Sequence, residues 1–406
     1  MLKSRLCIAF FAFAVGCAPA QKPLTDYVNP MLGTATLWDS VDLGFKPTKR
    51  TWGAEVFPGS SLPNAMVQVS PVTKFHSGAG YQYEDSVIYG FTHTNKGHWN
   101  LCHIPLLPVT GTPTPGDYCS PFSHERESAA PGYYQVFLDR YGVDAQLSST
   151  LRCAFHKYTY PAGAAASLLA DLQRSNEHVR AWDIRKEGDN VFAGWQQTGE
   201  KMYFYAVANR PVTGIEPVVE GDREVRIVRF GEGDGALELR IGFSFVSEKN
   251  ARENLEAEML GKSFAEVRSE ATATWNDLLG RIRVEGGTER EKGLFYSSLY
   301  RSFLWPALRS DVNGEFTDVD GKVINPGFRY YTGPSYWDDY RNKLILLGML
   351  APDVAADVIS SDTDKGEKRG GFMPTFFHGD HASAFVAGTY LRGNRGFDVN
   401  RAYNLV

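Results

Sequence analysis

Residues 236–266, ALELRIGFSFVSEKNARENLEAEMLGKSFAE, contain the point at which one kind of structure gives way to another. Up to Phe245, apolar residues alternate with polar ones, which is the pattern of a half-buried β-strand. Beyond Lys249, Ala, Glu and Leu dominate, and Ser263 with Glu266 forms the capping-box pair that begins a helix. The chain is therefore β-structure first and helix second, which predicts two domains rather than an alternating α/β fold.

Upstream of this point, short segments rich in β-branched and aromatic residues are separated by turns such as Pro115-Gly116-Asp117. The clearest lie at 66–70, 134–139, 143–150, 202–206, 224–230 and 236–245. About ten short strands with few helices are typical of a β-sandwich. We expect this domain to span residues 26–246.

Downstream, the pattern is helical. Thr288 with Glu291 forms a second capping-box pair, and helical spacing recurs at 339–349, 353–360 and 381–392. We expect a helical linker over 247–287 and a helical domain over 288–406.

Composition excludes several classes of protein. The 406 residues include 42 Lys and Arg against 47 Asp and Glu, a net charge of -5, whereas nucleic-acid-binding proteins carry a basic excess. Hydrophobic residues make up 43% and charged residues 22%, which is enough apolar material for packed cores. No P-loop, GxSxG or dinucleotide fingerprint is present.

Residues 1–20 have a short basic start and an apolar run too short to span a membrane, as in a signal peptide. Two processing alternatives remain. Cleavage after Ala20 gives an exported, periplasmic protein. A lipobox ending at Cys17 gives a lipid-anchored protein of the outer membrane or cell surface. In neither case does a transmembrane segment remain.

Three cysteines, Cys102, Cys119 and Cys153, remain in the oxidising compartment that an export signal implies. They cannot all pair within one chain. A bridge between Cys102 and Cys119 is one alternative, although sequence spacing does not establish it.

Residues 80–108 concentrate histidine, tyrosine, tryptophan and asparagine, including His93, His98 and Trp99. Aromatic rings stack on the apolar faces of sugars, and Asn and His hydrogen-bond to hydroxyls. Substrate contact is therefore one interpretation. The alternatives are histidines that brace the core or a loop, and zinc ligands, although the spacing matches no zinc motif.

Two later stretches have similar chemistry. In Ser335–Arg341 a tryptophan precedes two carboxylates, and Arg341 follows Asp338 by one helical turn. Asp338 is a candidate acceptor for sugar hydroxyls, whereas Asp339 has the alternative of capping the helix. In the HGDH run at 378–381, Asp380 is a candidate N-cap, which puts His381 at the start of a helix. Arg341 and His381 are, with Asp338, candidates for substrate binding.

A set of motifs in a fixed order carries a family resemblance. They are YVNPMLGT at 27–34, FPGSSLPNAMVQVSP at 57–71, YGFTHT at 89–94, APGYYQV at 130–136, VEGGT at 284–288, SYWDDYR at 335–341 and GDHASAF at 379–385. Together they resemble the glycoside hydrolase family 92 exo-α-mannosidases over nearly the whole chain. The resemblance implies an N-terminal β-sandwich, a helical linker and an (α/α)6 toroid.

The resemblance also implies a function: release of terminal α-linked mannose from glycans by an inverting mechanism that depends on Ca²⁺. Inversion requires one carboxylic acid and one carboxylate about 6.5–9.5 Å apart, with water between them. The Ca²⁺ ion is expected to engage the O2 and O3 hydroxyls of mannose. A non-catalytic glycan-binding protein derived from the same family is the alternative.

The chain departs from the family pattern in two places. Asn95–Asn100 replaces the glycine-rich loop that borders the substrate, and only about half of a twelve-helix toroid precedes Val406. The family's acid and base match no residue here, so we expect them beyond Val406 and assign no catalytic residue and no metal ligand. In an incomplete toroid, the stripe Phe295, Leu299 and Phe303 would lack partners.

Overall fold

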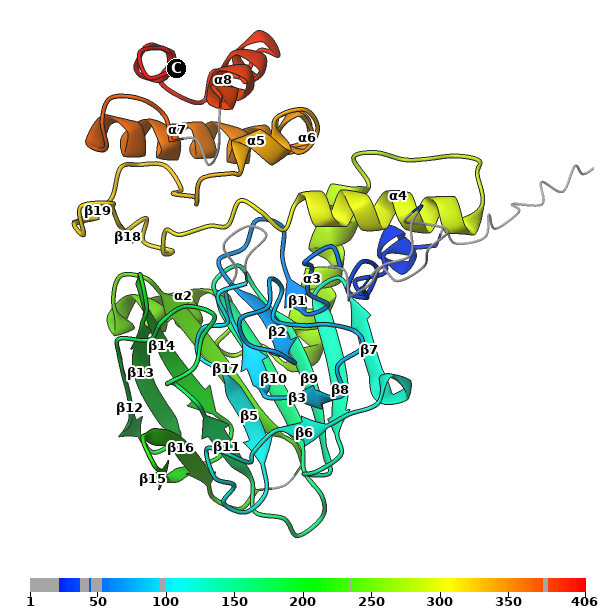
Figure 1. The fold of residues 1–406 in the computed structure, drawn as a ribbon, viewed down its shortest axis with the longest axis vertical. Coiled ribbons are helices and arrows are strands. Elements are labelled where there is room, and N and C mark those ends of the chain that lie inside the picture. Colours follow the sequence, from blue (N-terminus) through cyan, green and yellow to red (C-terminus); the bar gives the residue numbers. More distant parts are fainter. Residues whose placement is uncertain (1–21, 37–43, 45–52, 95–99, 234, 375–378) are drawn as a thin grey trace, which may run out of the picture.

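The computed structural model describes residues 22–36, 44, 53–94, 100–233, 235–374 and 379–406. Two large antiparallel sheets stack to form a β-sandwich, and most of the helices lie at one end of it (Figure 1). The order of β-structure followed by helix is as predicted. The predicted signal segment, with Cys17, lies outside the described residues.

One sheet has seven strands in the order β1-β2-β4-β5-β11-β16-β15. They are β1 (Ser60–Ser61), β2 (Gln68–Val72), β4 (Gly90–Thr92), β5 (Leu106–Val109), β11 (Ser167–Ala170), β16 (Arg223–Phe230) and β15 (Val212–Glu220). The short pair β3 (Val87–Ile88) and β6 (Ser120–Pro121) is separate from it, and η2 (His124–Arg126) follows β6.

The other sheet has eight strands in the order β12-β13-β14-β17-β10-β9-β8-β7. They are β12 (Ala181–Gly188), β13 (Val191–Gln197), β14 (Lys201–Ala208), β17 (Leu237–Ser244), β10 (Cys153–Thr159), β9 (Val143–Ser149), β8 (Tyr133–Leu138) and β7 (Glu127–Ala130). Each of the six strand segments predicted from the sequence overlaps a strand in one or the other of the two sheets. The sequence underestimated their number because strands of two to four residues are too short to show an alternation.

The core lies between the two sheets. Alternate residues of β14 are fully buried, among them Met202 and Phe204, and Phe204 pairs in register with Phe243 of β17. Successive side chains of a strand point to opposite faces of the sheet, so every second residue of β14 is buried in the core.

Two helices, α2 (Glu248–Glu258) and α3 (Phe264–Leu279), cover the opposite face of the eight-stranded sheet. Phe155 of β10 packs there against Leu255 and Phe264. Gly242 permits the close approach, because a Cβ atom at this position would lie 2.1 Å from the carbonyl oxygen of Ala251. The segment predicted as a linker therefore has a packing role in the sandwich.

The helix α4 (Glu289–Ser302) lies beside α3 and the short helix η1 (Leu24–Tyr27). Both predicted capping boxes are present, one at the start of α3 and one at the start of α4. The expectation of an unpartnered stripe is wrong for Leu299 and Phe303, which are buried, while Phe295 is partly exposed. Leu299 and Phe303 belong to the same hydrophobic cluster as residues of the sandwich and of α6.

The loop carrying the FPGSSLPN sequence forms that junction. Asn64, in the left-handed conformation with φ 52°, donates from its backbone N to the Phe303 carbonyl (2.6 Å) and from Nδ2 to the Pro306 carbonyl (2.8 Å). Trp275 of α3 donates from Nε1 to the Ser61 carbonyl (2.7 Å). The loop thus joins the sandwich to the segment that leads into the helices.

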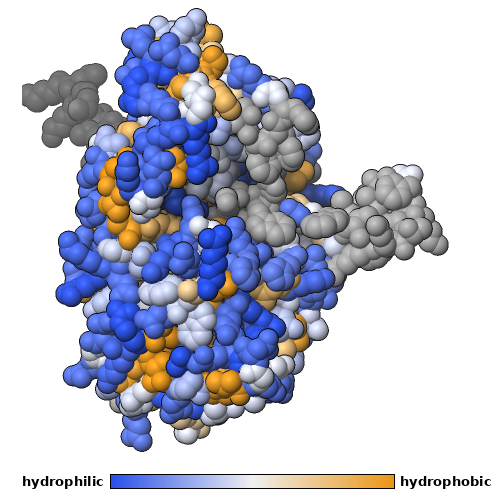
Figure 2. Space-filling model, turned by 60° about the vertical axis from the view of Figure 1, so that its left-hand side comes forward, coloured by the Kyte–Doolittle hydropathy of each residue, from blue (hydrophilic) through white to orange (hydrophobic). Residues whose placement is uncertain are grey.

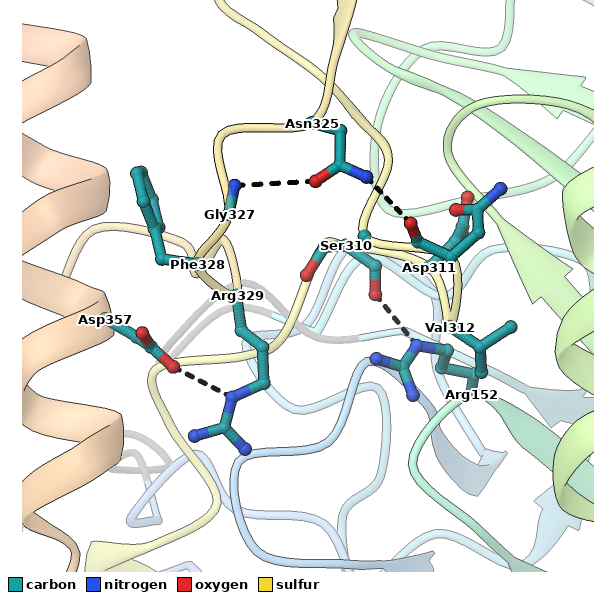
Figure 3. A pocket seen from close by; sticks show the side chains of 11 residues that line it. Arg152, Ser310, Asp311, Val312, Asn325, Gly327, Phe328, Arg329 and Asp357 are labelled. Carbon is teal, nitrogen blue, oxygen red and sulfur yellow. Dashed lines mark hydrogen bonds and ion pairs between the residues drawn. The ribbon is translucent and has the colours of Figure 1, made fainter.

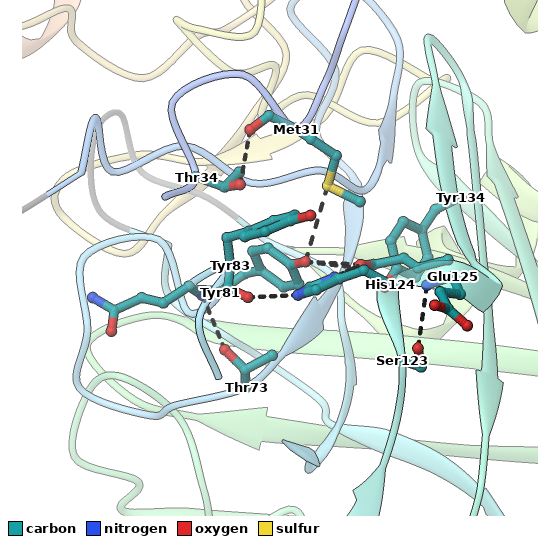
Figure 4. A network of polar contacts seen from close by, with 11 residues as sticks. Met31, Thr34, Thr73, Tyr81, Tyr83, Ser123, His124, Glu125 and Tyr134 are labelled. Carbon is teal, nitrogen blue, oxygen red and sulfur yellow. Dashed lines mark hydrogen bonds and ion pairs between the residues drawn. The ribbon is translucent and has the colours of Figure 1, made fainter. Parts of the chain in front are cut away.

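Figure 4 shows a polar cluster that ties the segment after η1 to the sandwich. The Tyr81 hydroxyl donates to Glu127 (3.0 Å) and lies 3.9 Å from the Met31 sulfur. His124 lies between Glu127 (Nδ1 to Oε2, 2.6 Å) and the carbonyl oxygen of Tyr83 (Nε2 to O, 2.6 Å). These contacts hold the His124 ring between the two segments.

The remaining helices are α5 (Tyr336–Asp339), α6 (Lys343–Leu350), α7 (Pro352–Lys368), α8 (His381–Leu391) and α9 (Val399–Tyr403), preceded by the hairpin β18 (Phe316–Thr317) and β19 (Val323–Ile324). Asp380 caps α8, as predicted, and Asp398 caps α9. Hydrophobic side chains appear in orange among hydrophilic ones at this end of the molecule (Figure 2). Large exposed examples are Met349, Phe372, Leu391 and Tyr403.

Two further findings bear on the sequence predictions. Cys102, Cys119 and Cys153 are all free thiols, so the alternative of a Cys102–Cys119 bridge does not apply. Among the helices of the described residues, none combines the length and the apolar character needed to cross a membrane.

Candidate functional site

The short helix α5 is fixed by its first residue. Tyr336 is buried, packs against Phe385 of α8, and donates from its hydroxyl to Asp362 Oδ2 (2.6 Å). The Lys365 ammonium donates to the other oxygen of Asp362 (2.8 Å). With Tyr336 held in this way, the next residues of the helix project outward.

Trp337 and Asp338 are the outward-facing residues. The Trp337 side chain is 51% exposed, although it is large and hydrophobic. Asp338 is also exposed and accepts a hydrogen bond from the Ser335 hydroxyl (2.5 Å) through one carboxylate oxygen. An exposed indole face beside a carboxylate is suited to a sugar ring, because the indole contacts C–H groups and the carboxylate accepts from hydroxyls.

Tyr340, Arg341 and His381 form a compact group next to them. The rings of Tyr340 and His381 are stacked, with centroids 4.2 Å apart and planes 2° from parallel. Arg341 donates from Nε to the Tyr340 hydroxyl oxygen (2.6 Å). We call Trp337, Asp338, Tyr340, Arg341 and His381 together the α5–α8 rim.

Three of the predicted site residues therefore lie in this group, in which Asp338 and Arg341 are exposed and His381 is partly buried. They come from α5, the turn after it and the start of α8. In this turn Arg341 donates a hydrogen bond to the Tyr340 hydroxyl and forms no ion pair with Asp338. The Asp338 carboxylate accepts from the Ser335 hydroxyl instead. His381 is oriented by the stack on Tyr340 and by its place directly after the N-cap Asp380.

Asp339 points differently from Asp338. Its carboxylate lies 3.3 Å from the Lys343 ammonium. Burial lowers the pKa of Lys343, and the nearby Asp339 carboxylate opposes that shift. Asp339 is therefore paired within the helical part.

His93 lies in the interior of the sandwich, which agrees with the alternative of a core histidine. Its side chain is 0% exposed, its Nε2 lies 3.0 Å from Nε2 of His156, and its ring is 4.6 Å from that of Phe243. Burial lowers the pKa of His93 to about 3, so the ring is neutral at physiological pH. A substrate in solvent does not reach this position.

His98 and Trp99 lie outside the described residues, so their contact with a substrate stays a prediction. The ends of their loop are well anchored. The Thr94 hydroxyl lies 2.8 Å from Nδ1 of His103, and the backbone N of Asn100 donates to the Gly78 carbonyl (2.8 Å).

A polar chain that sequence reasoning missed continues from this loop. His103 Nε2 lies 2.9 Å from the Thr198 hydroxyl, which donates to Glu177 (2.7 Å). Arg309, on the segment between sandwich and helices, is 6% exposed and has Nε 3.8 Å from Glu200. Burial lowers the pKa of Arg309. These residues are dispersed along the chain and belong to no motif, so only the fold brings them together.

The expected Ca²⁺ ion was compared with the side chains available. Nowhere in the described ranges do three or more His, Cys, Asp or Glu side chains gather in a way that could hold a metal ion. Calcium prefers several oxygen ligands, mostly carboxylates and carbonyls. The described side chains therefore do not themselves form a calcium site, and no metal ligand is assigned among them.

Two family models match consecutive parts of the chain. Residues 27–253 match the model of the glycosyl hydrolase family 92 N-terminal domain, and residues 250–406 match that of the glycosyl hydrolase family 92 catalytic domain. The second match includes the whole α5–α8 rim.

Solved structures give the same picture. The chain is similar to the family GH92 alpha-mannosidase BT3965 from Bacteroides thetaiotaomicron, with 26% identity and a TM-score of 0.85, covering 94% of this chain and 56% of that one. It is also similar to the family GH92 inverting mannosidase BT2199 from the same organism, with 25% identity and a TM-score of 0.82, covering 95% and 55%. The chain thus spans about half the length of these relatives.

BT3965 has also been solved in complex with mannoimidazole, and that structure matches with a TM-score of 0.84, 26% identity, and coverage of 94% of this chain and 55% of that one. Among curated proteins, an uncharacterized secreted glycosidase of Arthroderma benhamiae is 24% identical over 344 residues, which is 71% of this chain and 42% of that protein.

Proposed function

The chain belongs to glycosyl hydrolase family 92, and on this premise we propose that the protein is an exo-α-mannosidase that releases terminal α-linked mannose from glycans. The observation that carries the proposal is the match of residues 250–406 to the family's catalytic domain, because it includes the α5–α8 rim. The mannoimidazole complex of the relative BT3965 supports a mannose-like ligand.

The rim supplies groups that suit a terminal mannose. The exposed Trp337 ring offers a stacking surface, and the free oxygen of Asp338 accepts from a hydroxyl. Arg341 retains N–H groups beyond the one bonded to Tyr340, and these donate to sugar oxygens. His381, fixed by its stack on Tyr340, adds a further polar contact.

The chemistry proposed for the complete enzyme is inverting and dependent on Ca²⁺, which would orient the mannose hydroxyls. Inversion requires an acid and a base on opposite sides of the bond, roughly 6.5–9.5 Å apart. Asp338 and Asp339 do not meet this requirement, since they are adjacent on one short helix and Asp339 is paired with Lys343. The rim is therefore assigned to substrate binding, and the acid and base to no described residue.

Export is part of the same proposal. The relative from Arthroderma benhamiae carries the word secreted in its name, and residues 1–20 have the pattern of a signal peptide. We retain both routes, soluble secretion after Ala20 and lipid attachment at Cys17. Mass spectrometry of the mature N-terminus distinguishes them.

Activity is tested with the purified 406-residue chain on aryl α-mannosides and mannobioses, with Ca²⁺ and with chelator. We expect binding of mannosides without turnover. An acid and a base each contribute about 10²–10⁴-fold, and neither role is assigned here. Calcium-dependent turnover by this chain would show that both groups lie within the 406 residues.

Binding is tested by calorimetry with methyl α-mannoside and mannoimidazole. Asp338→Asn should weaken binding about tenfold, because a charged acceptor is replaced by a weaker neutral one. The matched control is Asp222→Asn, which makes the same change at an exposed turn of the sandwich. Equal affinities for both variants would remove the rim from the proposed site.

The alternative of a glycan-binding protein without catalysis is favoured by one observation, namely that the rim exposes contact residues but no acid and base pair. It makes a separate prediction. A chain of the relatives' full length would then bind mannosides tightly and still fail to hydrolyse them when Ca²⁺ is present.

A further inference from the structure

A pocket with a volume of about 470 Å³, lined by none of the residues of the α5–α8 rim, lies where the sandwich meets the helical part. Its walls come from the start of β10, the segment 310–329 and the middle of α7. Two arginines line it, Arg152 from the sandwich and Arg329 from the segment before α5, and both guanidinium groups point into it (Figure 3). Nothing in the proposed mannosidase function uses this pocket.

Each arginine is held in place by part of its hydrogen-bonding capacity. Arg152, whose side chain is 9% exposed, donates from Nε to the Ser310 carbonyl (2.8 Å) and from Nη1 to Glu258 (2.6 Å). Arg329 donates from Nε to Asp357 Oδ2 (2.8 Å). These bonds orient the two side chains and restrict their movement.

The rest of that capacity is free. Within the described residues, Nη2 of Arg152 and both Nη atoms of Arg329 donate to no protein oxygen. The Ser310 hydroxyl oxygen accepts from the backbone N of Tyr330 (3.1 Å), which leaves its own hydrogen available at the pocket wall. Each guanidinium group is paired with one carboxylate, Glu258 or Asp357, and an oxyanion between the two groups would add a further favourable charge interaction.

The carboxylates nearby are turned to other partners. Glu258 also accepts from the backbone N of Arg152 (2.9 Å), and Asp311 accepts from Ser244 (2.6 Å) and Asn254 (2.6 Å) on the sandwich side. Burial raises the pKa of Asp311 to about 6, and the hydrogen bonds from Ser244 and Asn254 oppose this shift.

We propose that this pocket binds a small oxyanion, held between the free guanidinium N–H groups of Arg152 and Arg329 with the Ser310 hydroxyl as an additional donor. Planar guanidinium groups suit phosphate, sulfate and carboxylate oxygens. The volume is large enough for a monosaccharide that carries the anion. The ligand is therefore either a free inorganic oxyanion or the anionic substituent of a sugar.

The test is calorimetry on the full chain at constant ionic strength, with inorganic phosphate, glucose 6-phosphate and glucuronate as probes. Binding of inorganic phosphate as tight as that of the sugar derivatives indicates a free-ion site. Preference for a sugar derivative indicates an anionic glycan or sugar. Failure of all three probes to bind at millimolar concentration overturns the proposal.

Variants locate the binding. Arg329→Ala should weaken it about tenfold or more, since hydrogen bonds to charged groups are worth about 1.5–3 kcal/mol. Arg329→Lys keeps the charge but loses the planar guanidinium group with its paired N–H donors. Its affinity should lie between those of the unaltered chain and of Arg329→Ala. Arg329 is 47% exposed, so both variants should fold, and circular dichroism checks this.

The matched control is Arg290→Ala, which removes the same charge from the exposed surface of α4. It should bind as tightly as the unaltered chain. If Arg290→Ala weakens binding as much as Arg329→Ala, the interaction is a general charge effect and the proposal fails. The outcome is independent of mannosidase activity, because no glycoside enters the measurement.

Discussion

Two histidine-containing regions of this protein have similar composition and opposite environments. His93 and His156 of the sandwich lie between the sheets with no exposure, hydrogen-bonded to each other. His381 of the rim lies at a helix start, stacked on Tyr340 beside the exposed Asp338 and Arg341. The same residue type therefore stabilises the fold in one region and is available to a ligand in the other.

The comparison shows that the residue type indicates which interactions a side chain can make. Its burial decides whether it makes them within the fold or with a ligand. A buried imidazole is held neutral and bonded to its neighbours, so its loss should affect stability. A rim side chain is bonded through only part of its polar groups, so its loss should affect binding. The following predictions test this division, from the largest expected effect to the smallest.

His93→Ala should lower the free energy of unfolding by about 3 kcal/mol. The change leaves a cavity in a packed core and an unpaired nitrogen on His156. Urea unfolding followed by tryptophan fluorescence measures the effect. His381→Ala, the matched change in the rim, should cost less than about 1 kcal/mol. Similar losses in the free energy of unfolding for both variants would contradict the distinction between core and rim histidines.

Acidification should destabilise the sandwich through the same histidine. The pKa of His93 is about 3 in the folded chain against 6.5 as its ordinary value, so the unfolded chain binds a proton that the folded chain does not. The stability from this group is complete above pH 6.5 and falls by about 1.4 kcal/mol per pH unit below it. His156 has the same sign, because burial lowers its pKa too.

One buried acid acts in the opposite direction. The pKa of Asp311 is raised from 3.8 to about 6, so below pH 6 the folded chain holds a proton that the unfolded chain lacks. The contribution of His93 to the pH dependence of stability is therefore isolated with a variant. The free energy of unfolding is measured at pH 6.5 and at pH 5.0 for the unaltered chain and for His93→Asn. The variant should lose about 2 kcal/mol less over this interval. An unchanged slope would show that His93 titrates normally.

Arg341→Ala should leave stability within about 0.5 kcal/mol and weaken mannoside binding roughly fivefold. The side chain is exposed, and its bond to the Tyr340 hydroxyl is a local one. Its remaining N–H groups are those available to sugar oxygens. Calorimetry with methyl α-mannoside, together with urea unfolding, separates the two effects. A loss of stability without a loss of affinity would show that Arg341 stabilises the fold and does not contribute to mannoside binding.

Tyr340→Phe should produce the smallest effect, about 0.5 kcal/mol in affinity. The ring stack on His381 is kept, and only the acceptor that positions Arg341 is removed. The same calorimetric titration measures the change. Tyr340→Leu, which also removes the stack, is the comparison variant and should weaken binding further.

Much of the fold could be predicted from local sequence. The change from alternation to helical spacing near residue 247, the two capping boxes and the N-cap Asp380 were all identified correctly. These features depend on residues within one turn or one strand of each other. Backbone geometry and hydrogen bonding to nearby amides are sufficient to determine them.

The sequence by itself also predicted Asp338, Arg341 and His381 as sugar-contacting residues, from their residue types and their neighbours in the chain. Only the tertiary structure decided that they share the α5–α8 rim, that His93 lies in the core, and that Arg152 and Arg329 line one pocket. Arg152 and Arg329 are far apart in sequence, and no periodicity relates them. Burial and long-range contact arise from the packing of whole sheets and helices, so they decide which polar side chains remain available to a ligand.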